Sequence, residues 1–184
     1  VVPVRKGSVR VKNKNLKRFS NSSLLEVKLR RLREIDTIQR IIVSSDCEEM
    51  LEVAKNYGLE THKREEYFAS SEANNSEFFK NLAESIDVEY IMYSPVTCPL
   101  ISKESYYECI KLFQSKDIEN LVTVSPVKHH MWLDGKPLNY SIDQSPNSQD
   151  LPDIYSLTYG ICLIYIDTEF DFMIAETVYE KINR

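Results

Sequence analysis

The sequence predicts an α/β protein of three layers, α/β/α, in which a mainly parallel sheet carries helices on both faces. Two observations lead to this fold class. Short apolar runs alternate with longer segments that have the apolar period of amphipathic helices. Nearly every predicted strand is followed by a helix, the usual crossover between parallel strands. The 184 residues, 42% of them apolar, suffice for one core, so we expect a single domain over residues 1–184.

The first predicted element is a buried strand at Val1–Val4, which ends in a basic loop. Ser22 or Ser23 can cap a helix that runs to about Asp36, and we expect Lys28 and the arginines of this helix to lie mostly on its outer face. The remaining predictions are a strand at 41–43, a helix at 48–57 that stops at Gly58, a strand at 59–62, an aperiodic polar stretch at 63–76, a helix capped by Asn74, Asn75 or Ser76, a strand at 90–93, a helix capped by Ser102, and strands at 121–124 and 160–165.

Charge is distributed unevenly along the chain. Residues 1–40 hold twelve Lys and Arg against three Asp and Glu, although the formal net charge of the whole chain is −5. A local basic patch on an acidic protein favours a small polyanion over a nucleic acid as the ligand.

No apolar run is long enough to predict a membrane span, and no signal peptide precedes the first strand, so we expect a cytoplasmic protein. The four cysteines show no C-x-x-C spacing and are expected to be small buried hydrophobes.

The loop after the first strand predicts a phosphate site. Residues 5–15 carry five cations, one glycine and one serine. Backbone N–H groups and Ser8 can surround a phosphate while Arg5, Arg10 and Lys14 neutralise it. The alternative is a basic loop that is merely solvated.

The spacing Arg5-x-x-Ser8-x-Arg10-x-x-x-Lys14-Asn15-Leu16 resembles the signature loop of the sugar-activating cytidylyltransferases, the group that contains the CMP-sialic acid and CMP-KDO synthetases. Further segments are similar to other blocks of that family and stand in the family's order: 40–46, Arg64 with 69–73, 97–100 and 128–130. The resemblance covers nearly the whole chain. It implies the Rossmann-like sheet of the nucleotide-diphospho-sugar transferases.

The resemblance also implies an activity and a set of site residues. In this family a hydroxyl of an acidic sugar attacks the α-phosphate of CTP and expels pyrophosphate, with Mg²⁺ as cofactor and a homodimer as the assembly, and with neither nucleic acid nor membrane as a partner. The implied catalytic cations are Arg5, Lys14 and Arg10. The implied nucleotide-binding residues are Arg5, Lys6, Gly7, Ser8, Arg10, Lys14, Asn15, Arg64, Ala73 and Asn75. The implied sugar-binding residues are Thr97, His129, His130, Gln149 and Tyr159, and the implied metal ligand is Asp167.

Several of these residues have a plainer interpretation. Arg64 could be a surface residue, and the histidine pair could hold a metal, act as a base or have only a structural role. Asp167 could simply cap the last helix. A glycosyltransferase, or a uridylyl- or guanylyl-type transferase, would share the same architecture.

Three positions depart from the family pattern: Pro95, Ser148 and Tyr159 stand where the family often has Gln, Arg and Asn. Loss of that Arg removes a bidentate contact with the carboxylate of the sugar, so sialic acid itself is not expected as the substrate. A non-catalytic or altered-substrate nucleotide-binding relative is therefore the alternative to an active enzyme.

The C-terminal part departs from the family as well. Tyr165 replaces the first residue of an Asp-x-Asp block, of which Asp167 is the second. The family's dimerisation segment is absent between Tyr165 and Ile166. This protein has either lost the segment or has it at a place where the sequence omits residues, and the abrupt start at Val1 favours omission.

Overall fold

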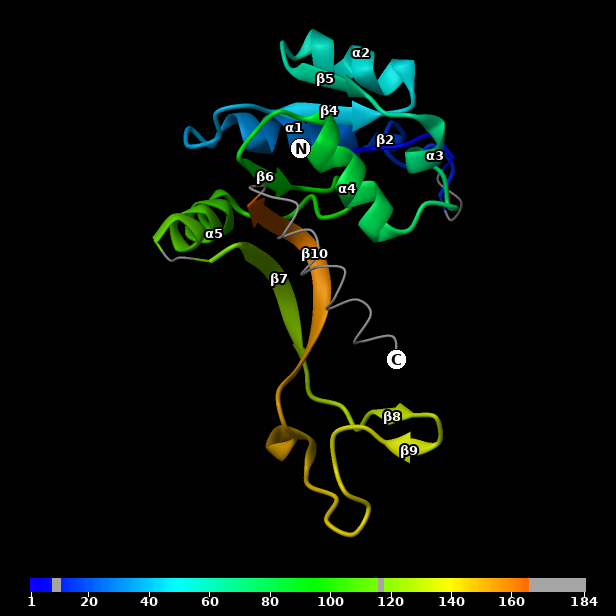
Figure 1. The fold of residues 1–184 in the computed structure, drawn as a ribbon, viewed down its shortest axis with the longest axis vertical. Helices are drawn as coiled ribbons and strands as arrows, with labels where there is room; N and C mark the ends of the chain where they lie inside the picture. The colour runs from blue at the N-terminus through cyan, green and yellow to red at the C-terminus, as the bar shows by residue number, and fades with distance from the viewer. Residues whose placement is uncertain (8–10, 116–117, 166–184) are drawn as a thin grey trace. The chain divides into compact units, whose positions relative to one another are not determined.

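The computed structural model describes residues 1–7, 11–115 and 118–165 (Figure 1). The described chain divides into two compact units, one formed by Val1–Leu121 with Gly160–Tyr165 and the other by Val122–Tyr159. We refer to them as the first and the second unit.

A parallel sheet forms the centre of the first unit. Strands β1 (Val2–Pro3), β4 (Ile42–Ser45) and β5 (Glu60–Lys63) are ordered β1-β4-β5, and both pairings are parallel. These are three of the predicted strands, within a residue or two at their ends. Because the strands are parallel, their carboxyl ends lie at one edge of the sheet.

The next strand, β6 (Tyr90–Tyr93), belongs to a second three-stranded sheet, ordered β6-β10-β7, and two hydrogen bonds link it to Val1, the residue before β1. The Val1 nitrogen donates a hydrogen bond to the Met92 carbonyl over 2.6 Å, and the Ser94 N–H donates to the Val1 carbonyl over 3.0 Å. Strand β10 (Ile154–Tyr165) then pairs with β6 in the antiparallel sense, with Cys162 opposite Tyr93, and lies between β6 and β7 (Asn120–Val127). The second sheet therefore contains an antiparallel pairing, whereas the sequence predicted a mainly parallel sheet.

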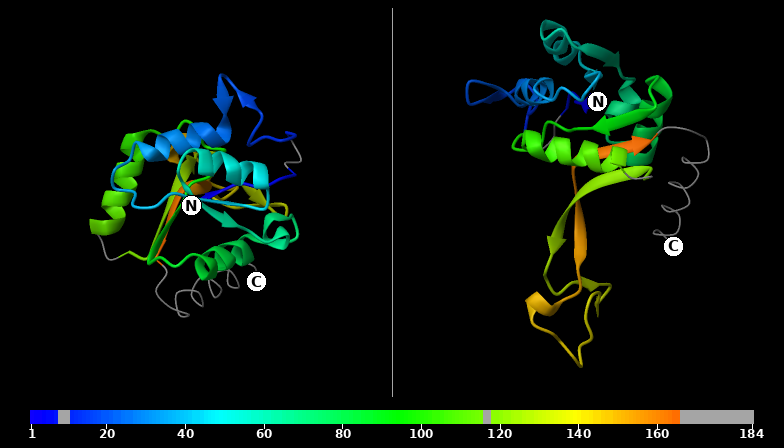
Figure 2. Two further views of the ribbon diagram at one scale, coloured as in Figure 1. Left: turned by 90° about the horizontal axis from the view of Figure 1, so that it is seen from above. Right: turned by 90° about the vertical axis from the view of Figure 1, so that its left-hand side faces the viewer.

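Helices cover both faces of the parallel sheet (Figure 2). Side chains of α1 (Leu24–Arg33), α2 (Glu48–Asn56) and α5 (Lys103–Ser115) pack in one cluster with Val43 of β4. The neighbouring Ile42 points to the opposite face, where it packs with Leu82 of α4 (Asn75–Ser85). This alternation along β4 is that of a strand buried on both faces, and it confirms the three predicted layers.

Local signals place the starts of α1 and α4 and the end of α2 as predicted, whereas α1 ends at Arg33 and not near the predicted Asp36. The Ser23 hydroxyl accepts the Glu26 N–H over 3.2 Å at the start of α1, and Asn74 forms a complete capping box with Glu77 at the start of α4. Helix α2 stops before Gly58, whose φ of +68° suits glycine.

Two predictions in this unit are wrong. Residues 66–69 form a short helix, α3 (Glu66–Ala69), within the stretch predicted to be aperiodic. Lys28 was expected mostly on the outer face of α1, but its side chain is only 1% exposed. The spacing contained the signal, because Lys28 follows Leu25 by three residues and precedes Leu32 by four, which places it on the apolar face.

The second unit contains most of β7, the first half of β10, one short hairpin and several turns. β7 runs on through Val127, beyond the predicted strand. β8 (Trp132–Leu133) and β9 (Lys136–Pro137) form a hairpin whose turn residues Asp134 and Gly135 both have positive φ, as a tight two-residue turn requires. A 3₁₀ turn at Ser148–Asp150 follows.

Two very short strands of the first unit, β2 (Arg18–Phe19) and β3 (Ser22–Ser23), pair with each other. Among the described residues, no helix has the length and apolar character needed to cross a membrane.

Candidate functional site

The basic loop, residues 5–15, starts where β1 ends and is fastened at its first residues. The Lys6 N–H donates to the Asp46 carboxylate over 3.0 Å, and Asp46 directly follows β4. Gly7 has φ of +82°, a conformation that glycine adopts without strain. The predicted phosphate ligands Ser8 and Arg10 lie outside the described residues.

Asn15 closes the same loop. Its side chain is 4% exposed, and its amide donates to the Arg5 carbonyl over 3.1 Å. Its own carbonyl accepts the Leu25 N–H over 3.1 Å, so the end of the loop is tied both to its beginning and to α1. In this structure Asn15 therefore holds the loop. Lys14 is half-buried, and its ammonium makes no hydrogen bond or ion pair within the described part of the chain.

Two arginines connect the basic loop to the segment after β5. Arg5 donates from Nη1 to the Ala69 carbonyl over 2.9 Å, and Arg64 donates from Nη2 to the Val4 carbonyl over 2.6 Å. The segments that follow β1 and β5 are thus tied together in both directions. The structure brings together Arg5 and Arg64, which the sequence had assigned to the same nucleotide.

Arg64 is buried, not a surface residue. It is 4% exposed, and its guanidinium lies 5.0 Å from the centre of the Phe78 ring. Burial lowers its pKa to about 10, which leaves it protonated at neutral pH. Its Nε is buried and donates to no atom of the described residues. An unpaired buried donor is unfavourable, and an acceptor on a bound ligand would relieve it.

The other two residues assigned to the nucleotide lie near the start of α4. Ala73 is half-buried, and Asn75 is the exposed first residue of the helix, directly after its cap Asn74. The Asn75 side chain makes no hydrogen bond to Arg5 or Arg64 within the described residues.

Residues 94–100, which we call the 94–100 loop, follow β6. Ser94 is fully buried, whereas Thr97, assigned to the sugar, is exposed. The buried Lys28 donates to the Cys98 carbonyl over 2.9 Å and to the Tyr106 hydroxyl over 2.7 Å. Sequence reasoning missed Lys28, and it also assigned no role to Asp46.

The remaining sugar-side residues belong to the second unit. His130 shares a hydrogen bond with the Pro146 carbonyl over 2.9 Å and packs edge-on against Tyr140 at 4.7 Å. His129 and Gln149 are exposed. Tyr159 is 38% exposed and has φ of +51°, the left-handed conformation that Asn adopts far more readily than Tyr. This is the position where the resembling family has Asn.

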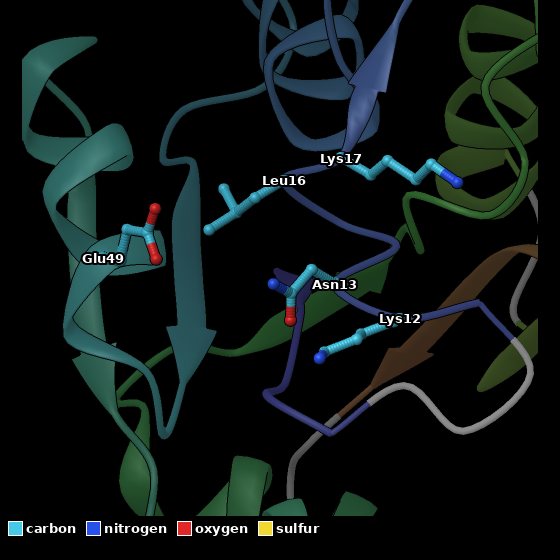
Figure 3. A pocket seen from close by; sticks show the side chains of 5 residues that line it. All are labelled: Lys12, Asn13, Leu16, Lys17 and Glu49. Carbon is cyan, nitrogen blue, oxygen red and sulfur yellow. The ribbon is translucent and has the colours of Figure 1, made fainter.

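A small hollow of about 400 Å³ lies beside the basic loop (Figure 3). Leu16 points toward α2, which carries Glu49, whereas Lys17 points the other way. The side chains that line it are those of Lys12, Asn13, Leu16, Lys17 and Glu49. These do not include the predicted nucleotide ligands.

The predicted metal ligand Asp167 lies outside the described residues. Within the part of the chain that the structure describes, no group of three or more His, Cys, Asp or Glu side chains could hold a metal ion.

A basic glycine-containing loop and a buried arginine, held together at the carboxyl ends of parallel strands, are typical of a nucleotide-binding α/β protein. The family model described as cytidylyltransferase matches residues 1–134. The chain therefore belongs to the cytidylyltransferase family.

Two curated relatives show how far the likeness extends. The chain is 24% identical over 220 residues to N-acylneuraminate cytidylyltransferase of Escherichia coli O18:K1:H7, covering 100% of this chain and 52% of that protein. It is 22% identical over 196 residues to pseudaminic acid cytidylyltransferase of Campylobacter jejuni serotype O:2, covering 97% of this chain and 84% of that protein. The chain thus spans about half the length of the first relative and most of the second.

Solved structures share the fold. CMP:2-keto-3-deoxy-manno-octonic acid synthetase complexed with CTP superimposes with a TM-score of 0.67 at 11% identity, covering 96% of this chain and 76% of that one. The 4-diphosphocytidyl-2C-methyl-D-erythritol synthase of Anaerococcus prevotii superimposes with a TM-score of 0.64 at 14% identity, covering 98% and 74%. The predicted nucleotidyltransferase fold is confirmed.

Proposed function

We propose that this protein transfers the cytidylyl group of CTP to a hydroxyl of an acidic sugar. The sugar oxygen forms a bond to the α-phosphorus, the bond from that phosphorus to the oxygen of the leaving pyrophosphate breaks, and the hydroxyl proton passes to solvent or a base. The observation that carries the proposal is the pair of contacts by which Arg5 and Arg64 join the basic loop to the segment after β5. The names of the two curated relatives support an acidic sugar as the acceptor.

The basic loop would hold the triphosphate. Backbone N–H groups around Gly7, together with Ser8, can surround phosphate oxygens, while Lys14, Arg10 and the remaining donors of Arg5 neutralise charge. Catalysis of this transfer rests mainly on positioning and on stabilising negative charge, and both are what this loop can supply.

Arg64 would recognise cytosine. Its unpaired Nε is a donor that the cytosine carbonyl or ring nitrogen can satisfy, and the 69–75 segment can complete the contacts to the base.

Asp167 would hold Mg²⁺, because a carboxylate oxygen is a ligand that this ion prefers. The ion would supply positive charge to the triphosphate.

Thr97 of the first unit would contact the acceptor sugar. The other residues that the resemblance assigns to the sugar, His129, His130, Gln149 and Tyr159, belong to the second unit. His130 already shares a hydrogen bond with Pro146, so His129 is the more available of the two histidines. The departures at Pro95 and Ser148 favour an acidic sugar other than sialic acid.

Pyrophosphate release with a panel of acidic sugars tests this function. N-acetylneuraminic acid, pseudaminic acid and 2-keto-3-deoxy-manno-octonic acid should each be offered with CTP or with UTP. We expect release with CTP and an acidic sugar, and at least about tenfold less with UTP, because the exchanged amine and carbonyl leave buried polar groups unpaired. Arg64→Met should reduce this preference, whereas Arg30→Met, on the exposed face of α1, should not. Equal use of CTP and UTP by the unaltered protein would exclude cytosine recognition.

We also propose a homodimer in the cytoplasm. The second unit exposes several large apolar side chains, including Trp132, Leu133 and Ile142 at 55%, 59% and 65%, and such surface is often covered by a partner. All four cysteines are free thiols, as is usual in a reducing compartment. Analytical ultracentrifugation should give twice the mass of the chain at micromolar concentration, and a monomer there would contradict the dimer.

A further inference from the structure

Lys28 is a buried cation that the proposed chemistry does not explain. It lies on α1 with 1% of its surface exposed, and no carboxylate in the described residues forms an ion pair with it. Its ammonium instead donates to the Cys98 carbonyl and the Tyr106 hydroxyl, and it lies 5.4 Å from the centre of the Tyr106 ring.

These contacts fasten the 94–100 loop at two points. Lys28 holds Cys98 directly, over 2.9 Å. The Tyr106 hydroxyl, which accepts from Lys28, is also 2.6 Å from the hydroxyl of the fully buried Ser94. Thr97 lies between the two fastened residues and is exposed, so its position depends on both of them.

Stability does not explain a lysine at this position. Burial of an ammonium without a carboxylate is unfavourable, and apolar residues of similar volume are often as stable or more stable in such places. What an apolar residue cannot do is donate to the Cys98 carbonyl. The bonds to the loop are therefore the property that distinguishes lysine here.

We propose that Lys28 is a positioning residue: through Cys98 and, by way of Tyr106, through Ser94, it holds the 94–100 loop so that Thr97 faces the acceptor sugar. The role of Thr97 rests on the proposed function, whereas the hold on the loop does not. Lys28 itself touches neither substrate.

The order of the loop tests the proposal without any substrate. NMR relaxation on the full chain gives backbone order parameters for Val96, Thr97 and Cys98. In Lys28→Met we expect them to fall from about 0.85, typical of rigid backbone, to below about 0.6. Arg33→Met removes one charge from the exposed face of the same helix and should leave them unchanged. Unchanged order parameters in Lys28→Met would overturn the proposal.

Kinetics separate positioning from a merely structural role. Lys28→Met should raise the KM for the acceptor sugar by about tenfold, the effect of losing one charge-assisted hydrogen bond, with little change in CTP affinity or melting temperature. A parallel loss of CTP affinity and melting temperature with no change in loop order would contradict the positioning role. If no acidic sugar is a substrate, the proposed function fails, but the order parameters still decide the role of Lys28.

Tyr106→Phe is a second variant that keeps the ring and removes only the hydroxyl that links Lys28 to Ser94. It should lower the order parameter of Ser94 and its neighbours, and it serves the same test if Lys28→Met does not fold. Full order in both variants would mean that the loop is held by other contacts.

Discussion

Lys28 makes stability depend on pH. Burial is the main cause that lowers its pKa from 10.5 to about 8. Cys98 on the loop raises this pKa and the positive charge of Arg31 on the same helix lowers it further, while the neutral Tyr106 of α5 carries no charge that would shift it. Between these two pKa values the unfolded chain binds more protons than the folded one, so the free energy of unfolding increases with pH. Through Lys28, the free energy of unfolding can increase by about 3 kcal/mol between pH 8 and pH 10.5.

Denaturant unfolding at pH 7 and pH 10 measures this dependence. Burial also raises the pKa values of the Cys109 and Cys162 thiols, but the unaltered protein and Lys28→Met both contain these thiols, so their effect cancels in the comparison. The stability of the unaltered protein relative to Lys28→Met should therefore increase from pH 7 to pH 10. If the two proteins differ in stability by the same amount at pH 7 and at pH 10, the pKa of Lys28 is not lowered in the folded protein.

Tyr159 carries local backbone strain. A bulky residue at φ of +51° is disfavoured by about 1 to 2 kcal/mol, whereas Asn tolerates this conformation. Tyr159→Asn should therefore be neutral or stabilising in thermal unfolding. Tyr155→Asn, a matched change on the same strand at a residue without positive φ, should be destabilising. If both variants lose the same stability, Tyr159 is not strained.

Individual residues were predictable where the signal is local. The stop at Gly58 was predicted, and the caps Ser23 and Asn74 were among the two or three candidates for each helix, because caps and stops act within one turn of a helix. Lys28 was missed because a lysine is expected outside even when its spacing places it inside. The unpaired Nε of Arg64 depends on Val4 and Phe78, which are distant in sequence, so no local pattern could reveal it.

Among the elements, the basic loop depends on a neighbouring strand for its shape. The Asp46 carboxylate after β4 accepts the Lys6 N–H and so fixes the first turn of the loop. Asp46→Asn keeps an acceptor oxygen, whereas Asp46→Ala removes it. We expect Asp46→Ala to bind CTP roughly fivefold more weakly than Asp46→Asn, the effect of one hydrogen bond, as measured by calorimetry. Equal affinity in the two variants would show that Asp46 does not shape the loop.

The helices and parallel strands followed from the sequence because apolar periodicity and the β-α alternation are local properties. The antiparallel pairing of β10 with β6 joins residues about seventy positions apart and was not predicted. The β8–β9 hairpin was also missed, although Asp134-Gly135 is a turn signal, because the strands on either side are only two residues long.

At the scale of the whole molecule, the nucleotide and sugar residues divide between the two units. The predicted nucleotide ligands belong to the first unit, as does Thr97, while the histidines, Gln149 and Tyr159 belong to the second. The alignment with the first relative spans 220 residues against the 184 of this chain, so that relative has residues without a counterpart here.

Identification of the product tests the central claim most directly. The protein should be incubated with CTP, Mg²⁺ and each acidic sugar of the panel, and the mixture analysed by mass spectrometry and ³¹P NMR. We predict a CMP-sugar with one phosphorus in a diester between cytidine and the sugar, together with one pyrophosphate per product. CTP binding without any such product, for every acidic sugar offered, would contradict the account and would favour a nucleotide-binding relative that has lost transfer.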